Sequence, residues 1–225
     1  MKILRPEDRV CEIIELQKKC PRIISVVGAG GKTTLIFRLA EELRQMGKRV
    51  LITTTTKMYV PKQYYVPWQE EGQEKKSRGQ MREQVVEQIQ AQLSREGIAV
   101  TGQPLHCEEK FTGVPGKERE SLSMLCDVLL VEADGSRQRP VKVPAVHEPV
   151  LFPGTELVIG VLGMRSVGQR ILDAAHRPED VAAFLHTDVE HRMTKEDLEV
   201  IAKSPRGLKK GADCDFVAVG NMYEP

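Results

Sequence analysis

The fold is decided by one stretch, Ile23-Ile24-Ser25-Val26-Val27-Gly28-Ala29-Gly30-Gly31-Lys32-Thr33-Thr34-Leu35. Its first half, rich in Ile and Val, is typical of a buried strand. Three glycines within four residues end that strand, and a helical pattern follows directly. The stretch therefore predicts a strand, a glycine-rich loop and a helix, which together form a phosphate-binding unit.

The residue types in this loop suit a nucleoside triphosphate. The first N–H groups of a helix lack intrahelical acceptors and attract anions, and glycine lets the backbone close around a phosphate. Lys32 is expected to reach the outer phosphates, and the hydroxyl of Thr33 is expected to bind Mg²⁺. The predicted nucleotide-binding residues of the loop are Gly28, Ala29, Gly30, Gly31, Lys32, Thr33 and Thr34.

The spacing of the loop departs from the usual Walker A pattern, which is a glycine, four other residues and Gly-Lys-Ser/Thr. Val26 occupies the position of the usual first glycine, and only two residues separate Gly28 from Gly31. The shorter loop resembles the Gly-Thr-x-Gly-Lys-Thr loop of the Mur ligases. A dinucleotide fingerprint fits less well, because its third glycine would fall on Thr33. A glycine-rich turn that binds no ligand is the plain alternative.

A later strand ends in carboxylates. Four apolar residues, Val128 to Val131, are followed by Glu132 and Asp134, and alternation along a strand places both carboxylates on one face. A carboxylate in this position holds Mg²⁺ and orients an attacking group in phosphoryl transfer. Either carboxylate could serve, while a turn at Asp134-Gly135 is the alternative for Asp134 alone. The predicted metal ligands are Thr33, Glu132 and Asp134.

A threonine run, Thr53-Thr54-Thr55-Thr56-Lys57, follows the predicted strand Arg49–Ile52. Ligands bind at the carboxyl ends of strands in an open parallel sheet, so this run is expected beside the phosphate loop. Thr55 and Lys57 are therefore candidates to contact phosphate, Mg²⁺ or a second substrate. The alternative is that the β-branched threonines simply extend the strand.

Positively charged side chains follow the acidic strand end. Prolines at 140, 144, 149 and 153 favour an extended path that carries Arg137 and Lys142. We expect Arg137 to contact the nucleotide or a second substrate, and a solvated surface linker is the alternative. The predicted catalytic residues are Lys32, Glu132, Asp134 and Lys142.

The remaining periodicities alternate between helix and strand, and short links indicate parallel pairing by right-handed crossovers. We predict an α/β fold in three layers, with a doubly wound, mostly parallel sheet of the P-loop nucleotide hydrolase type. Residues 1–225 are expected to form one domain, with a small inserted α/β segment or flap at 60–116 after the second strand. Other predicted helices cover residues 6–19, 32–46, 81–95, 118–125, 178–185 and 194–202, and other strands cover 156–163 and 215–220.

The composition excludes several classes of function. The 225 residues carry a net charge of +1 and only 4% aromatic side chains, so no feature favours binding to nucleic acid or to a membrane. No apolar run approaches the roughly 20 residues needed to span a bilayer. The five cysteines are scattered without a Cys-x-x-Cys pair, which argues against disulfides and structural zinc. We expect a cytoplasmic protein.

Several motifs occur in a specific order along the chain: Val27–Thr34, Thr53–Met58, Val131–Ser136, Lys142 with Pro144 and His147-Glu148-Pro149, and Ala175–Val181. This set resembles the YqeC family of accessory proteins for selenium-dependent molybdenum hydroxylases, over most of the chain from Pro21 onward. The resemblance implies a step with Mg²⁺ and ATP or GTP in the maturation of such an enzyme. It also implies a molybdenum hydroxylase, or its cofactor, as a partner.

The base and the reaction stay open at the level of sequence. Family members resemble GTPase-like proteins in an Asn-Lys-x-Asp-like segment after the last strand, but Asn221-Met222-Tyr223-Glu224 lacks both Lys and Asp. An enzyme that hydrolyses or transfers phosphate is one hypothesis. A binding or chaperone module that holds a phosphate-bearing cofactor such as molybdopterin, without turnover, is the other.

Overall fold

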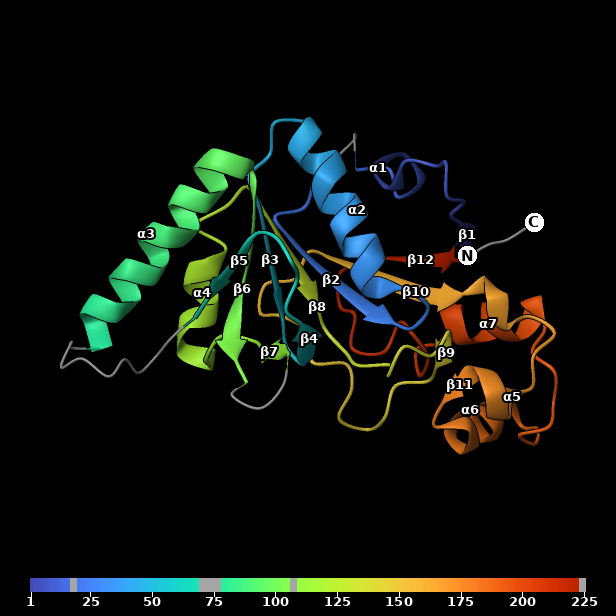
Figure 1. Cartoon of the computed structure of the whole chain (residues 1–225). Helices are drawn as coiled ribbons and strands as arrows, with labels where there is room; N and C mark the ends of the chain where they lie inside the picture. Colours follow the sequence, from blue (N-terminus) through green and yellow to red (C-terminus); the bar gives the residue numbers. More distant parts are fainter. Residues whose placement is uncertain (17–19, 69–77, 106–108, 223–225) are drawn as a thin grey trace.

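A ten-stranded sheet forms the centre of the molecule in the computed structural model, which describes residues 1–16, 20–68, 78–105 and 109–222. Its strand order is β1-β12-β10-β2-β8-β3-β6-β7-β4, with β5 paired to β6 (Figure 1). The strands are β1 (Lys2–Ile3), β2 (Ile23–Gly28), β3 (Val50–Thr54), β4 (Lys57–Tyr59), β5 (Tyr65–Pro67), β6 (Ile98–Pro104), β7 (Lys110–Thr112), β8 (Val128–Glu132), β10 (Leu157–Gly163) and β12 (Asp215–Asn221).

The pairs from β1 through β6 are parallel, and β7 pairs antiparallel with both β6 and β4. The chain leaves β2, passes through α2 (Lys32–Gln45) and returns as β3, which leaves space for β8 between β2 and β3. β2, β8 and β10 consist entirely of buried residues. The predicted α/β fold with a mostly parallel sheet is therefore confirmed.

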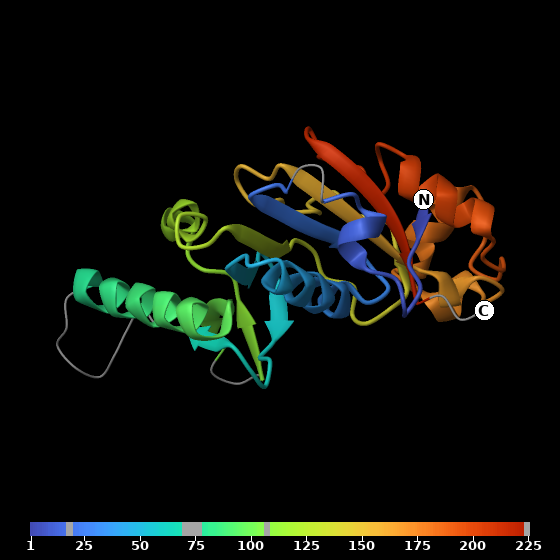
Figure 2. The same cartoon turned by 90° about the horizontal axis from the view of Figure 1, so that it is seen from above.

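Helices cover both faces of the sheet. The buried stripe of α2 packs with α1 (Val10–Ile13) against one face, and alternate strand residues turn to the opposite face. Figures 1 and 2 show α3 at one end of the molecule and α5, α6 and α7 at the other. The remaining helices are α3 (Arg78–Glu96), α4 (Arg119–Leu122), α5 (Ile171–Ala174), α6 (Pro178–Leu185) and α7 (Lys195–Lys203), with single 3₁₀ turns at Gly116–Glu118 and Met164–Ser166.

The helix predicted over residues 6–19 is wrong in extent, because only Val10–Ile13 is helical and residues 17–19 lie outside the described residues. The preceding segment is held in a non-helical path by the guanidinium of Arg38, which donates to the carbonyls of Arg5, Pro6 and Asp8. Glu42 accepts the N–H groups at the start of α1, from Val10 and Cys11. Contacts from α2 thus override the local helical pattern.

The segment 60–116 joins the main sheet. β6 lies parallel to β3, and the antiparallel pair β7–β4 continues from the carboxyl end of β6. The strands of this segment are therefore continuous with the main sheet. Trp68 is buried in the core beside α3. Residues 69–77 and 106–108 of this segment lie outside the described residues.

A two-stranded ladder lies beside the carboxyl end of β10. It pairs β9 (Val141–Lys142) in parallel with β11 (Ala175–His176), so that Lys142 is opposite His176. Pro140, just before β9, accepts the N–H of Gly163 at the end of β10 (2.7 Å). Figure 1 places the ladder between the sheet and α5–α6.

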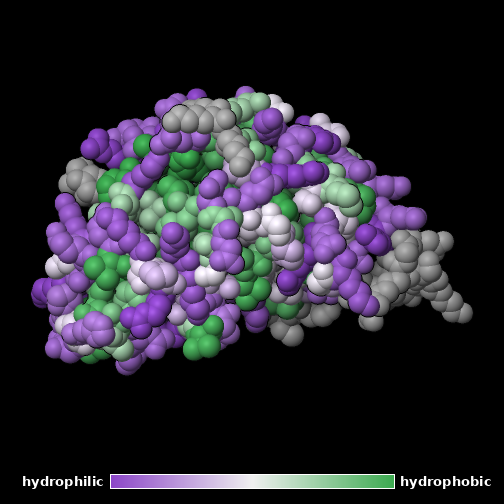
Figure 3. Space-filling model, turned by 180° about the vertical axis from the view of Figure 1, so that it is seen from behind, coloured by the Kyte–Doolittle hydropathy of each residue, from purple (hydrophilic) through white to green (hydrophobic). Residues whose placement is uncertain are grey.

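The outer surface is mixed in character. Hydrophilic residues cover most of the face in Figure 3, with hydrophobic residues scattered among them in small groups. None of the described helices combines the length and the apolar composition required to cross a bilayer.

Candidate functional site

The loop between β2 and α2 packs against the end of β10. Gly28, Gly30 and Gly31 have φ values of 93°, 79° and 92°, which disfavour every residue except glycine. A Cβ on Gly28 would lie 2.3 Å from the carbonyl oxygen of Val161, and a Cβ on Gly30 would lie 2.2 Å from the N atom of Gly163. These glycines therefore allow the loop to approach the backbone of β10.

The N–H groups in the first half of the loop already donate to protein oxygens. They join Gly28 to Oδ2 of Asp134 (2.9 Å), Ala29 to the carbonyl of Val161 (2.8 Å) and Gly30 to the carbonyl of Arg139 (3.1 Å). In the second half, the N–H groups from Gly31 to Thr34 donate to no protein acceptor in the part of the chain that the structure describes. The four N–H groups at the beginning of α2 are thus the ones left for an anion.

Lys32 is held beneath this loop. Its side chain is only 3% exposed, and its Nζ atom donates to the carbonyl of Gly28 (2.8 Å) and to Oγ of Ser136 (3.3 Å). Nζ also lies 3.3 Å from Oδ1 of Asp134, a buried oxygen that accepts no hydrogen bond from the described residues. The predicted approach of Lys32 to the acidic strand end is thus present in the structure.

Thr33 and Glu132 meet at the same edge of the sheet. The Thr33 hydroxyl donates to Oε2 of Glu132 (2.7 Å), because β8 is the direct neighbour of β2 and Glu132 pairs with Val26. Burial raises the pKa of Glu132 above its usual value, which the charge of Lys32 and the Thr33 hydrogen bond only partly offset. The carboxyl group is therefore easier to protonate than an exposed glutamate.

Thr33 and Glu132 provide a hydroxyl and a carboxylate oxygen, the hard oxygen ligands that Mg²⁺ prefers. Asp134, the third predicted ligand, lies between the ammonium groups of Lys32 and Lys142, at 3.3 Å from each. Its charge is therefore already balanced, which makes it a weaker candidate than Glu132. Among the described residues no cluster of three or more His, Cys, Asp or Glu side chains could hold a metal ion. A metal at this position would need further oxygens from a ligand or water.

Lys142 is completely buried below the loop. Its ammonium group donates to the carbonyl of Gly135 (2.7 Å) and to Oε2 of Glu148 (2.9 Å), in addition to its ion pair with Asp134. Two protein oxygens and the charge of Asp134 therefore surround the buried ammonium group. Lys142, predicted as catalytic, is thus placed to hold Asp134 in position and does not face solvent.

Glu148 extends a series of ion pairs, from Asp134 through Lys142 to Arg177, toward the surface. Oε2 of Glu148 also accepts hydrogen bonds from the guanidinium of Arg177 and from the N–H of Ala145. Partial burial of Glu148 favours its protonated form, but Ala145, Lys142 and Arg177 outweigh that effect and lower the pKa to about 2. Alternating charges therefore connect the phosphate loop with the β9–β11 ladder.

The other three predicted contact residues lie around this centre. The backbone N–H of Thr55 donates to the carbonyl of Glu132 (3.0 Å), while its hydroxyl donates to the carbonyl of Val150 (2.7 Å). Lys57 is exposed at the start of β4. Arg137 is exposed and adopts a left-handed backbone conformation with φ of 47°. Thr53 and Thr54 belong to β3, so these two threonines extend the strand, which was the alternative interpretation of the threonine run.

Sequence reasoning missed three residues of this region. Asn221, at the end of β12, donates from Nδ2 to the carbonyl of Gly30 (3.0 Å) and so holds the loop from the side. Glu148 and Arg177 complete the chain of charges through Lys142. Their motifs were visible in the sequence, but Asn221 lies 191 residues from Gly30 and Arg177 lies 29 residues from Glu148, and local patterns cannot reveal such contacts.

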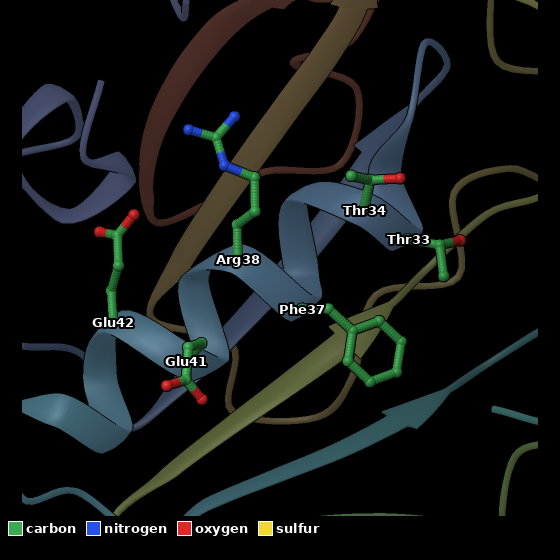
Figure 4. A pocket seen from close by; sticks show the side chains of 6 residues that line it. All are labelled: Thr33, Thr34, Phe37, Arg38, Glu41 and Glu42. Carbon is green, nitrogen blue, oxygen red and sulfur yellow. The ribbon is translucent and has the colours of Figure 1, made fainter. Parts of the chain in front are cut away.

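An open groove of about 640 Å³ begins at the loop and follows the outer side of α2. Figure 4 shows Thr33 and Thr34 at the beginning of the helix, with Phe37, Arg38, Glu41 and Glu42 on the following turns. Thr33 belongs both to the groove and to the pair with Glu132. The loop is therefore accessible from the outer side of the helix.

Comparison with known proteins places the chain in a family. A sequence model of the family described as YqeC protein matches residues 24–179, which include the phosphate loop, the acidic strand end and the β9–β11 ladder. A protein of Escherichia coli (strain K12), described as uncharacterized protein YqeC, is 33% identical over 203 residues, covering 86% of this chain and 72% of the relative. The chain therefore belongs to the YqeC family.

Proposed function

We propose that this protein binds a nucleoside triphosphate, ATP or GTP, together with Mg²⁺, and hydrolyses it or transfers its outer phosphate. The observation that carries the proposal is the set of N–H groups from Gly31 to Thr34, which have no acceptor among the described residues and lie next to the ammonium of Lys32. Four N–H donors, a helix N-terminus and a lysine form a site for a polyphosphate. The neighbouring Thr33–Glu132 pair supplies oxygen ligands for the metal.

Each residue then has a distinct task. Lys32 exchanges its present oxygen partners for phosphate oxygens, and Asp134 keeps its ammonium group beside the loop in the absence of phosphate. Lys142 is a positioning residue, because its buried ammonium group forms hydrogen bonds to Gly135 and Glu148 and an ion pair with Asp134. Thr33 and Glu132 would hold Mg²⁺, which would supply positive charge to stabilise the transferred phosphate.

Membership of the YqeC family supports a biological setting for this activity. We propose a nucleotide-dependent accessory step in the maturation of a selenium-dependent molybdenum hydroxylase. The hydroxylase or its cofactor would be the partner, and the step would take place in the cytoplasm. Nothing in the composition favours nucleic acid as a partner, since the net charge is +1 and aromatic residues make up 4%.

A second candidate is a module that holds a phosphate-bearing cofactor, such as molybdopterin, without turnover. The favouring observation is that Gly28, Ala29 and Gly30 already donate their N–H groups to protein oxygens. The remaining donors would suffice for a single phosphate group. Incubation with Mg-ATP or Mg-GTP, alone and with the partner hydroxylase, separates the two candidates through the release or transfer of phosphate.

Calorimetric titration with ATP and GTP in the presence of Mg²⁺ tests the proposed site. We expect saturable binding of at least one nucleotide, and a loss of about tenfold to a hundredfold in affinity for Lys32→Ala, because a charged hydrogen bond contributes roughly 1.5–3 kcal/mol. Lys48→Ala is the matched control, since Lys48 lies just beyond the opposite end of α2. Equal affinity in wild type and Lys32→Ala would show that the nucleotide binds elsewhere.

A further inference from the structure

We propose that the β9–β11 ladder carries a second anion site, formed by Arg137, His176 and Arg177, that binds a phosphate group of the second substrate. The proposal rests on the proposed function, because it names the chemistry of the molecule that reacts beside the nucleotide. Its observations come from residues that the phosphate loop does not use.

The ladder is attached directly to the loop. Lys142 in β9 pairs with His176 in β11, and Lys142 reaches Asp134, which accepts the N–H of Gly28. Arg177, the residue after β11, joins the same chain of charges through Glu148. A ligand on this ladder is therefore close in structure to the nucleotide loop, although separate from its N–H groups.

Two arginines of the ladder have unused donors. Arg137 is exposed and forms no ion pair with any residue that the structure describes. Nε of Arg177 is buried without a hydrogen-bond acceptor among the described residues, while the same guanidinium is paired with Glu148 and lies 3.5 Å from Oδ2 of Asp180. A buried guanidinium N–H without an acceptor is costly, and an oxyanion would satisfy it.

His176 lies within reach of several positive charges. Partial burial lowers its pKa, the charges of Arg177, Lys142 and Arg137 lower it further, and only Glu148 acts in the opposite direction. The lowered pKa favours the neutral imidazole, and the neighbouring positive charges favour an anion. A bound phosphate would offset the surrounding positive charge and make the imidazole easier to protonate.

The backbone adds an independent observation. Arg137, Gln138 and Arg177 adopt φ values of 47°, 63° and 59°, in the left-handed region that residues other than glycine rarely occupy. Such conformations occur preferentially at ligand-binding sites, where the surrounding structure holds them in place. All three residues lie within a few positions of the ladder.

Titration of the full-length protein with inorganic phosphate at constant ionic strength tests this site. The reporter is the imidazole NMR signal of His176, which the His176→Gln variant identifies. We expect a saturable shift of this signal and a higher pKa for His176 in the presence of phosphate. Arg137→Gln should weaken the apparent affinity by about tenfold, because it removes one charged hydrogen bond from an exposed position that has no structural partner.

Two control variants show whether the phosphate response of His176 is specific to the proposed second site. Arg95→Gln removes an exposed arginine at the opposite edge of the sheet, and Lys32→Ala removes the lysine of the phosphate loop. Both should keep the response of His176 to phosphate. A response that is absent in wild type, or that disappears in Lys32→Ala but persists in Arg137→Gln, would overturn the proposal.

This design separates the second site from the proposed function. A protein that binds no Mg-nucleotide but keeps the phosphate response at His176 contradicts the proposed function alone. A protein that binds Mg-nucleotide but lacks the phosphate response contradicts the second site alone.

Titration with methyl phosphate then shows whether the site takes the phosphate group of an organic molecule or a free oxyanion. Binding equal to that of inorganic phosphate supports an organic phosphate as the substrate, and weaker binding supports a free oxyanion.

Discussion

The ammonium group of Lys32 has two alternative sets of partners. It now contacts the carbonyl of Gly28, the hydroxyl of Ser136 and the carboxylate of Asp134. A phosphate in the loop would offer charged oxygens in their place, so that one set of charge-assisted contacts replaces another. Because Asp134 is also held by Lys142, it remains balanced when Lys32 turns toward a ligand.

The ionised carboxylate of Glu132 that would bind a metal is disfavoured by its burial, which lowers the stability of the fold. Burial raises its pKa in the folded state, so the folded protein holds this proton more tightly than the unfolded chain does. The free energy of unfolding then falls as the pH rises from the unfolded value of about 4.5 through the folded pKa. We expect Glu132→Gln to be more stable than wild type at pH 8, and this difference to shrink toward pH 5.

Urea denaturation of both proteins at pH 5 and pH 8 measures this difference. Glu87→Gln on the exposed side of α3 is the control and should show no change in the difference from wild type between the two pH values. A Glu132→Gln protein that is less stable than wild type at pH 8 would mean that the ionised carboxylate stabilises the fold.

At the scale of residues, sequence reasoning identifies the centre of the site but not its supports. Lys32, Thr33, Glu132 and Asp134 follow from two local motifs and from the rule that ligands bind at the carboxyl ends of parallel strands. The bond from Asn221 to Gly30 spans 191 residues, so no local pattern can predict it. Lys142 was predicted as catalytic, but its complete burial depends on Asp134 and Glu148.

At the scale of elements, the β9–β11 ladder is stabilised by ion pairs more than by the backbone pairing of its short strands. Each of its strands has only two residues, and the carboxylate of Glu148 joins Lys142 of β9 to Arg177 just after β11. The folded pKa of Glu148, about 2, lies below its unfolded value near 4.5. The stability that this carboxylate contributes is therefore fully present above about pH 4.5 and is lost as the pH falls toward 2.

We expect Glu148→Gln to lower the free energy of unfolding at pH 7 by about 2 kcal/mol, because charged hydrogen bonds to a buried lysine are lost. The loss relative to wild type should shrink as the pH falls from 5 toward 3. Urea denaturation at these pH values provides the measurement. An equally large loss at pH 3 and pH 7 would show that packing, and not ionisation, explains the effect.

Elements with strong local signals were predicted well. α2, α6 and α7 begin and end close to their expected positions, and Thr194 forms a capping box with Asp197 at the start of α7. The helix expected at 6–19 failed because Arg38 and Glu42 of α2 bind the backbone of that segment. Distant side chains there decide between helix and extended chain, which periodicity alone cannot reveal.

At the scale of the whole molecule, the strand order creates the site. β8 lies between β2 and β3, so its carboxylates meet the loop that follows β2. Parallel pairing could be predicted from the alternation of strands and helices. The continuation of the sheet through β6, β7 and β4 could not, because short strands after a long helix are equally compatible with a separate subsheet.

We propose that the N–H groups from Gly31 to Thr34 form an anion cradle beside Lys32. Backbone amide NMR shifts, recorded with and without Mg²⁺ and a non-hydrolysable ATP or GTP analogue, test this cradle. We expect these four amide signals to shift most, ahead of Gly28, Ala29 and Gly30, whose N–H groups keep their protein acceptors. Unchanged signals from Gly31 to Thr34, with saturable shifts elsewhere in the protein, would contradict it.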